Sequence, residues 1–211
     1  MSEAICKKCR RAGEKLFLKG DKCFTPKCAF VLRPFAPGKL DSERKHRSQV
    51  TEYGYQLKEK QKVKNNYGVS ESQFAAYAKV AIITATKVKD VSQPMALIQS
   101  LETRLDNSVY RMGLANSRAL ARQIVNHGHI CVNGKRMSIP SYSLKVGDII
   151  TVREGSKVSK LFTINLENKK DHKSPSWLKA DISKLTAEMV SMPKEITETF
   201  DLAKVFEFYS R

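Results

Sequence analysis

The chain has 211 residues, of which 41% are hydrophobic and 28% are charged. This balance is typical of a folded chain and excludes disorder throughout, and no apolar run approaches the roughly 20 residues that cross a bilayer. The first residues lack the apolar core of a secretory signal, so we expect a cytoplasmic protein without a membrane partner. Lys and Arg total 38 against 21 Asp and Glu, and the net charge of +17 indicates a polyanionic partner.

The positive charge is unevenly distributed. Residues 1–70 hold 17 basic and 7 acidic side chains, and residues 102–165 hold 10 and 4. Residues 166–211 are balanced, with 8 of each. The first third and a central segment therefore carry the field that would attract a polyanion, whereas the C-terminal segment is expected to be scaffold.

The N-terminal segment is unusual in its cysteines. Four of the five follow the spacing C-x2-C-x13-C-x4-C: Cys6, Cys9, Cys23 and Cys28. Two close pairs suit a four-thiolate Zn²⁺ site, which would be structural because no ligand position stays open. A disulfide pair, a thioredoxin-like redox site and an iron–sulfur cluster are the alternatives. Zinc would fold a loop-rich unit that is poor in apolar residues. Folding would in turn present nearby cations to phosphates, namely Lys7, Lys8, Arg10 and Arg11.

Helices are expected to follow. Apolar residues at helical spacing predict a helix within residues 41–67, which Gly68 would end. Ser70 and Gln73 fit a capping box at the start of the next helix. Residues 97–112 predict one continuous amphipathic helix, because Ile98, Leu101, Leu105, Val109 and Met112 share a stripe. Ser117 then caps a helix to about residue 126.

The hydrophobic period changes to two after residue 128. Ile130 and Val132 alternate with polar neighbours, and Asn133-Gly134 is a strong hairpin pattern. Short strands continue to Val152. Residues 98–165 are therefore predicted to form a small α+β module, with two helices followed by a short sheet. A polar linker and a terminal helix around residues 202–209 complete the chain.

Arginines on the helices, a histidine pair and a hairpin tip make this module a candidate RNA-binding surface: Arg104, Arg111, Arg118, Arg122, His127, His129, Asn133 and Lys135. An arginine can grip two phosphate oxygens at once, and structured RNA is read largely through its shape, phosphates and ribose hydroxyls. Plain alternatives compete for some of these residues. Asn133 could serve turn geometry alone, and the histidines could be a helix-end and a strand residue.

The order of motifs in this region resembles a known family. "LETRLDNSVYRMG", "SRALARQIVNHGHICVNGKRM" and "PSYSLKVGDII" resemble the RNA-binding module named after small-subunit ribosomal protein four. "CKKCRRAGEKLFLKGDKCFTPKC", "LKEKQKVKNNYGVSESQF" and the terminal "EFYSR" resemble the rest of the bacterial ribosomal protein four family, in its zinc-containing form. The resemblance covers nearly all of the chain.

The resemblance implies a structural, non-enzymatic protein of the small ribosomal subunit. Such a protein binds a helix junction in the 5′ domain of the rRNA and nucleates assembly of the subunit body. It lies beside ribosomal protein five and other small-subunit proteins, near the place where mRNA enters, and it contributes to decoding accuracy. The four cysteines would hold one structural Zn²⁺. The basic region after residue 40 would add rRNA contacts: Arg44, Lys45, Arg47, Lys58, Lys60 and Lys62.

The expected fold class is α+β, with a discontinuous, mainly helical domain. Its parts are a zinc-binding unit at residues 1–40 and helices at residues 41–97, completed by residues 166–211. The module at residues 98–165 is inserted between them. We expect the aromatic C-terminal segment to pack on the helical domain through Trp177, Phe206, Phe208 and Tyr209.

Two other functions compete with the ribosomal one. RNA pseudouridine synthases often carry this module, and Arg104-Leu105-Asp106 mimics their catalytic motif, but Asp106 lies inside the module and a separate catalytic domain is missing. A stand-alone zinc-containing RNA-binding regulator is the remaining alternative. Such a regulator need not prefer a multi-helix rRNA junction. For a ribosomal protein we expect no small-molecule substrate.

Overall fold

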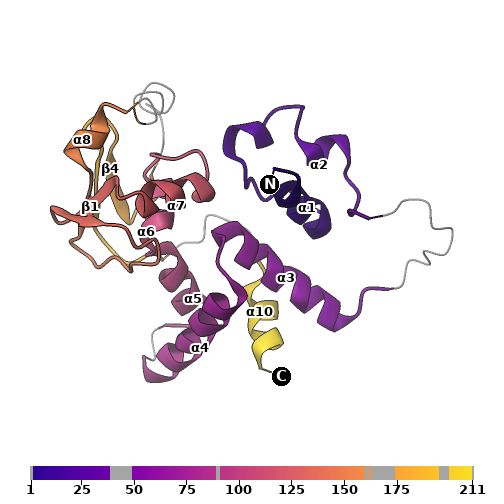
Figure 1. Ribbon diagram of the computed structural model, residues 1–211. Coiled ribbons are helices and arrows are strands. Elements are labelled where there is room, and N and C mark those ends of the chain that lie inside the picture. The colour runs from indigo at the N-terminus through magenta and orange to yellow at the C-terminus, as the bar shows by residue number, and fades with distance from the viewer. Residues whose placement is uncertain are drawn as a thin grey trace. The chain divides into compact units, whose positions relative to one another are not determined.

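The computed structural model describes residues 2–38, 49–88, 91–159, 162, 174–194 and 200–210. The chain divides into two compact units (Figure 1). Unit 1 comprises Met1–Lys79 and Glu198–Arg211, and unit 2 comprises Val80–Thr197. Within the described ranges, no helix has the length and apolar character needed to span a membrane.

Unit 1 joins the two ends of the chain. Its elements are α1 (Ser2–Ala12), a 3-10 helix η1 (Gly20–Cys23), α2 (Ala29–Leu32), α3 (Glu52–Tyr67), the first half of α4 (Glu71–Lys87) and α10 (Leu202–Tyr209). The terminal helix α10 lies along α3 (Figure 1). Phe208 packs on Tyr53 with ring centroids 5.6 Å apart, and Tyr209 packs on Phe74 at 6.2 Å. The neutral C-terminus therefore supplies aromatic core to the N-terminal helices.

The predicted helix ends in this part of the chain are confirmed. The Gln73 N–H donates to Ser70 Oγ at 3.3 Å, and the Ser70 N–H donates to Gln73 Oε1 at 3.4 Å, which completes the capping box. Gly68 ends α3 with φ of 64°, a left-handed conformation that glycine adopts without strain. In unit 2, Ser117 Oγ accepts from the Leu120 N–H at 3.3 Å. Each such serine cap contributes about 1 kcal/mol to helix stability.

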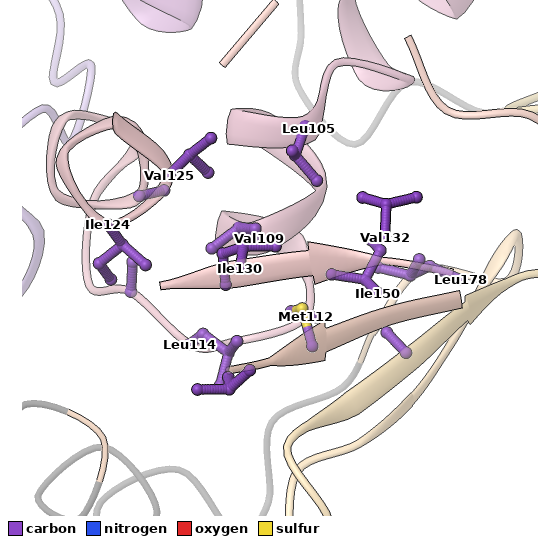
Figure 2. Close-up of a cluster of buried hydrophobic side chains, with 14 of the residues drawn as sticks. Leu105, Val109, Met112, Leu114, Ile124, Val125, Ile130, Val132, Ile150 and Leu178 are labelled. Carbon is purple, nitrogen blue, oxygen red and sulfur yellow. The ribbon is translucent and has the colours of Figure 1, made fainter. Parts of the chain in front are cut away.

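Unit 2 is a helical layer against a five-stranded antiparallel sheet. Its helices are α5 (Gln93–Glu102), α6 (Leu105–Arg111), α7 (Arg118–Asn126) and the short α8 (Glu154–Lys157). Its strands are β1 (Ile130–Val132), β2 (Lys135–Met137), β3 (Ile149–Val152), β4 (Leu178–Asp181) and β5 (Thr186–Met189), in the order β2-β1-β3-β5-β4. Figure 2 shows Val109 of α6, Ile124 of α7, Ile130 of β1 and Ile150 of β3 in one buried cluster. The predicted mixture of helices and a small sheet is confirmed for the described residues.

The sheet extends beyond the expected module boundary at residue 165. Strand β5 pairs with β3, with Ile150 opposite Ala187, and β4 pairs with β5. Trp177 precedes β4 and is buried in the core of unit 2, so the expectation that it packs on the helical domain with the C-terminal aromatic residues was wrong. The physical reason is that β3 would otherwise leave a row of backbone groups unpaired.

The expected continuous helix over residues 97–112 is broken into α5 and α6. Leu105 and Asp106 N–H groups donate to the carbonyls of Tyr142 and Pro140, at 2.8 and 3.1 Å, and the Leu144 N–H donates to the Thr103 carbonyl at 2.9 Å. A distant loop thus satisfies the backbone groups that the break exposes. The apolar stripe continues across the break, which is why periodicity alone predicts one helix.

Candidate RNA-binding surfaces and the cysteine cluster

The four N-terminal cysteines gather in unit 1. Cys6, Cys23 and Cys28 line one cleft of about 400 Å³ together with basic side chains from α1 and the following loops. All are free thiols. Burial raises the pKa of the Cys9 thiol, the charges of the other three cysteines raise it further, and a backbone hydrogen bond with Leu16 opposes them. The sequence spacing therefore does bring the four thiols into one neighbourhood.

This donor set suits a thiophilic metal. The Lys19 N–H donates to Cys23 Sγ at 3.4 Å, and hydrogen bonds of this kind orient the ligands of metal sites. Within the described part of the chain, however, no three Cys, His, Asp or Glu side chains stand close enough together to form a metal site. The cluster has the chemistry of a zinc site without its closed arrangement, so zinc binding remains a prediction.

A basic groove lies between α1 and α3. It encloses about 840 Å³ over an apolar floor that includes Ala12, Leu57 and Val69. Six cations line it: Lys7, Lys8, Arg11, Lys58, Lys62 and Lys64. Of these, Lys62 pairs with Glu14 at 3.1 Å and Glu59 at 2.6 Å.

The remaining groove cations differ in their pairing. Lys64 pairs with Glu71 at 2.8 Å. The other four are exposed and have no acidic partner among the residues that the structure describes: Lys7, Lys8, Arg11 and Lys58. Cations that are not neutralised by the protein's own acids are available to external phosphates. Four predicted RNA contacts therefore meet in one groove.

Lys60 has a different role from the one predicted. Its side chain is 6% exposed, and its Nζ donates to Glu71 Oε1 at 2.5 Å and lies 4.2 Å from the centre of the Phe208 ring. Partial burial would raise the pKa of Glu71, but the hydrogen bonds and charges of Lys60 and Lys64 outweigh it and lower that pKa. The structure gives Lys60 this structural role, because its charge is buried and holds α10, and the RNA contact predicted for it stays a prediction.

The other N-terminal cations divide into two groups. Arg10 donates through Nε to the Phe35 carbonyl at 2.9 Å and lies over the Phe35 ring at 5.0 Å, so it fixes the segment that follows α2. Arg10 also lines the cysteine cleft. Arg44, Lys45 and Arg47 lie outside the described residues.

In unit 2, the Asp106 carboxylate accepts hydrogen bonds from two of the arginines predicted to bind RNA. Arg104 donates to both Asp106 carboxylate oxygens, at 3.0 and 2.9 Å, and is only 2% exposed. Arg122 of α7 donates to Asp106 Oδ2 at 2.9 and 2.6 Å and is half-buried. Arg104 therefore has a structural role in this fold, because its guanidinium is buried against the Asp106 carboxylate, and the RNA contact predicted for it stays a prediction.

A second network joins the other two arginines. Arg111 donates to both Glu102 oxygens, at 3.0 and 2.7 Å, and Asn107 Nδ2 donates to Glu102 Oε2 at 2.7 Å. Arg118 donates to Asn107 Oδ1 at 2.8 Å and lies over the Tyr110 ring at 4.7 Å. These bonds fix the guanidinium groups at the junction of α5, α6 and α7. Among the residues that the structure describes, two acids, Glu102 and Asp106, are bonded within a group of four arginines, so these side chains together carry a net positive charge.

The hairpin tip uses its asparagine for folding. Asn133 has φ of 49°, its Nδ2 donates to Asp148 Oδ1 at 2.8 Å, and its Oδ1 accepts from the Ile149 N–H at 2.9 Å. Turn geometry therefore accounts for this residue without RNA. Lys135 is exposed at the start of β2.

The histidine pair lies at the end of α7. The His127 and His129 rings stack with centroids 6.0 Å apart, and His129 Nδ1 lies 2.9 Å from Ser156 Oγ. The Arg136 guanidinium lies against Gly128, where an added Cβ would meet its Nε at 2.2 Å. Arg136 is exposed, and it was not among the candidate RNA-binding residues predicted from the sequence, although it follows Lys135 directly on the hairpin.

Comparison with known proteins agrees with this arrangement. Residues 103–150 match the S4 domain, and residues 1–102 match the family described as "Ribosomal protein S4/S9 N-terminal domain". A "Small ribosomal subunit protein uS4" from Kosmotoga olearia is 44% identical over 209 residues, which cover 98% of this chain and 97% of that protein. The protein of the same name from Acetivibrio thermocellus is 46% identical over 212 residues, covering 99% and 97%. "Small ribosomal subunit protein uS4A" from Alkaliphilus oremlandii is 45% identical over 212 residues, covering 100% and 98%.

The S4 domain and the basic helices of the N-terminal region together define an RNA-binding protein of the ribosomal class. Similarity continues over essentially the whole chain. The chain belongs to the small ribosomal subunit protein uS4 family, whose members are structural proteins and not enzymes.

Proposed function

We propose that this protein, a structural component of the small ribosomal subunit in the cytoplasm, is a primary rRNA-binding protein. In this role it binds a helix junction in the 5′ domain of the rRNA and nucleates assembly of the subunit body. It lies beside ribosomal protein five, near the place where mRNA enters, and contributes to decoding accuracy. Family membership supports the ribosomal role, and the charge distribution supports direct contact with RNA.

The observation that carries direct binding is the groove between α1 and α3. Lys7, Lys8, Arg11 and Lys58 are exposed around it and lack acidic partners among the described residues. Because RNA phosphates are regularly spaced and strongly anionic, several unneutralised cations along one groove favour a sugar-phosphate backbone over an isolated small anion. The apolar floor suits the ribose carbons that lie between phosphates.

The arginine junction of unit 2 is the second proposed contact. Arg111, Arg118 and Arg122 are half-buried, and the acids and amide that hold them leave a net positive charge. A guanidinium that is already oriented loses less side-chain entropy when it meets a phosphate. Their bonds to Glu102, Asn107 and Asp106 therefore prepare them for RNA.

Binding can be tested by measuring affinity for purified small-subunit rRNA over a range of salt concentrations. The triple variant K8Q/R11Q/K58Q should bind at least tenfold more weakly at moderate salt. Its log–log salt slope should be shallower by about 3 if duplex-DNA arithmetic transfers to RNA. The matched control K179Q/K184Q/K194Q removes the same charge from exposed positions outside the groove. Equal slopes for the two triple variants would count against the groove as the RNA site.

We also propose one structural Zn²⁺ held by Cys6, Cys9, Cys23 and Cys28. Four thiolates would close the coordination shell, so the ion would stabilise folding and would not activate a substrate. Metal analysis of the purified protein should give one zinc per chain and little iron. A C23S/C28S variant should lose the metal, and retention of zinc in that variant would contradict the assignment.

The alternative of a stand-alone RNA-binding regulator makes a different prediction. A regulator should bind its target as tightly as, or more tightly than, the 5′-domain rRNA junction. Competition between this junction and unrelated structured RNAs of equal length distinguishes the two functions.

A further inference from the structure

Two phenylalanine rings in unit 1 are exposed and stacked on one another. Phe17 is 42% exposed and Phe24 is 72% exposed, and their ring centroids lie 4.9 Å apart with planes 25° apart. One exposed apolar side chain is ordinary on a protein surface. Two stacked and exposed rings are less ordinary, because they present a flat π surface to the surroundings.

The backbone around Phe24 is ordered by hydrogen bonds. Phe24 follows η1, and its N–H donates to the Asp21 carbonyl at 3.0 Å. The next residues are fixed too, since Thr25 Oγ1 donates to the Lys22 carbonyl at 3.0 Å and the Cys28 N–H donates to the Thr25 carbonyl at 3.1 Å. The Phe24 ring therefore projects from a turn with an ordered backbone.

Phe17 occupies a backbone conformation that disfavours its own side chain. Its φ is 49°, in the left-handed region where a bulky residue is strained. A glycine would adopt this conformation more easily, so folding alone does not explain a phenylalanine at this position. Stacking on Phe24 gives the ring a partner but leaves both rings exposed.

The charge around the rings indicates what could cover them. Residues 15–27 contain four lysines and one acid: Lys15, Lys19, Lys22, Lys27 and Asp21. Three of these lysines, Lys19, Lys22 and Lys27, line the adjoining cysteine cleft. A flat apolar surface on a segment this basic complements a nucleotide, whose base has a π face and whose phosphate is anionic. An apolar pocket on a protein would gain nothing from these cations unless its rim were acidic.

We propose that Phe17 and Phe24 form a stacking platform for an unpaired base of the rRNA. This inference rests on the proposed rRNA binding and adds a second kind of contact to it. The groove cations would neutralise phosphates, whereas the platform would hold one base by its face. A base of any identity could stack there, so the platform would favour an unstacked nucleotide in the fold of the RNA without reading its sequence.

The test compares full-length variants at Phe24 for binding to purified small-subunit rRNA. Leu at this position keeps apolar bulk but removes the aromatic face, whereas Tyr keeps the face. F24L should bind about five- to a hundredfold more weakly, and F24Y should bind within about twofold of the wild type. The salt slope of F24L should equal that of the wild type, because no phosphate contact is lost. Val31→Ala, a change at another exposed apolar residue of unit 1, should have no effect.

Chemical probing of the same complexes locates the base. One unpaired nucleotide should be protected at its base by the wild type and by F24Y, and it should become reactive again with F24L. Wild-type affinity of F24L, or equal losses in F24L and F24Y, would overturn the platform. Lack of rRNA binding by the wild type would instead overturn the proposed function. If F24L keeps full RNA affinity but loses binding to a neighbouring ribosomal protein, the surface is a protein contact and the proposal is wrong.

Discussion

The Asp106 carboxylate on α6 accepts two hydrogen bonds from Arg122 on α7, at 2.9 and 2.6 Å. The same carboxylate also accepts both bonds from Arg104, which precedes α6 and is buried. One acid therefore ties together two segments that are 16 residues apart in sequence. It also neutralises the buried guanidinium of Arg104.

Replacement of Asp106 by Asn should strongly destabilise the protein. The amide preserves the shape of the side chain but removes the negative charge that Arg104 and Arg122 bind, so the buried Arg104 guanidinium loses its charge-assisted bonds to Asp106. Breaking a buried pair in this way costs about 3–5 kcal/mol. Denaturant unfolding should show a loss in this range for D106N and less than about 0.5 kcal/mol for the exposed control E154Q. A loss below about 1 kcal/mol in D106N would contradict the structural role.

Substitution of Asn133 separates turn geometry from RNA contact. Asn133→Ala loses the bonds to Asp148 and Ile149 and places alanine at a positive φ, so it should lower the unfolding free energy by about 2–3 kcal/mol. Asn133→Gly retains the backbone conformation and should cost about 1 kcal/mol. Affinity for rRNA, measured well below the melting temperature, should be unchanged in both. A large loss of affinity in the glycine variant would restore Asn133 as an RNA contact.

Tyr209 should titrate late and should make stability fall in strong alkali. Burial, the charge of Glu71 and a hydrogen bond to Glu71 raise the pKa of Tyr209 to about 12, from 10.0. Because the folded state holds this proton more tightly than the unfolded state, the stabilisation is present below pH 10 and is lost as the pH rises toward 12. Tyrosinate absorbance should show one late-titrating group that is missing in Y209F. Identical titration curves for the two proteins would contradict the prediction.

Removal of metal should affect the N-terminal segment selectively. If zinc links the cysteine pairs, a chelator should make the first 38 residues sensitive to protease, because their few buried apolar residues form only a small cluster. The core of unit 2 contains none of the four cysteines and should keep its protection. Unchanged digestion of the N-terminal segment after complete loss of metal would show that zinc does not hold it together.

The sequence predicted elements where local chemistry determines them. Gly68 ends a helix, Ser70 and Gln73 cap one, and Asn133 begins a tight turn, each because its own side chain or backbone freedom fixes the local geometry. The cysteine spacing placed Cys6, Cys23 and Cys28 on one cleft, but the described residues form no closed metal site. These features depend on residues only a few positions apart or on a strongly constrained spacing.

Predictions failed where the decisive partner is distant in sequence. The break at Arg104 depends on backbone bonds to residues 140–144, the fifth strand depends on pairing with β3, and the fourth depends on pairing with the fifth. The basic sequence predicts Arg104 and Lys60 as surface cations. In the structure both are buried, because Arg104 bonds to Asp106, and Lys60 bonds to Glu71 and lies over the Phe208 ring. The number of basic residues in the sequence predicts a basic surface. Which of these cations stay exposed depends on the ion pairs that they form in the folded protein.

Hydroxyl-radical footprinting of the full-length protein on naked small-subunit rRNA, at several salt concentrations, tests the central claim most directly. Direct primary binding predicts protection concentrated on one multi-helix junction in the 5′ domain, weakening steeply as salt increases. The K8Q/R11Q/K58Q variant should lose part of that protection at a salt concentration where K179Q/K184Q/K194Q retains it. Diffuse protection, or none, with the folded wild-type protein would contradict a primary rRNA-binding role.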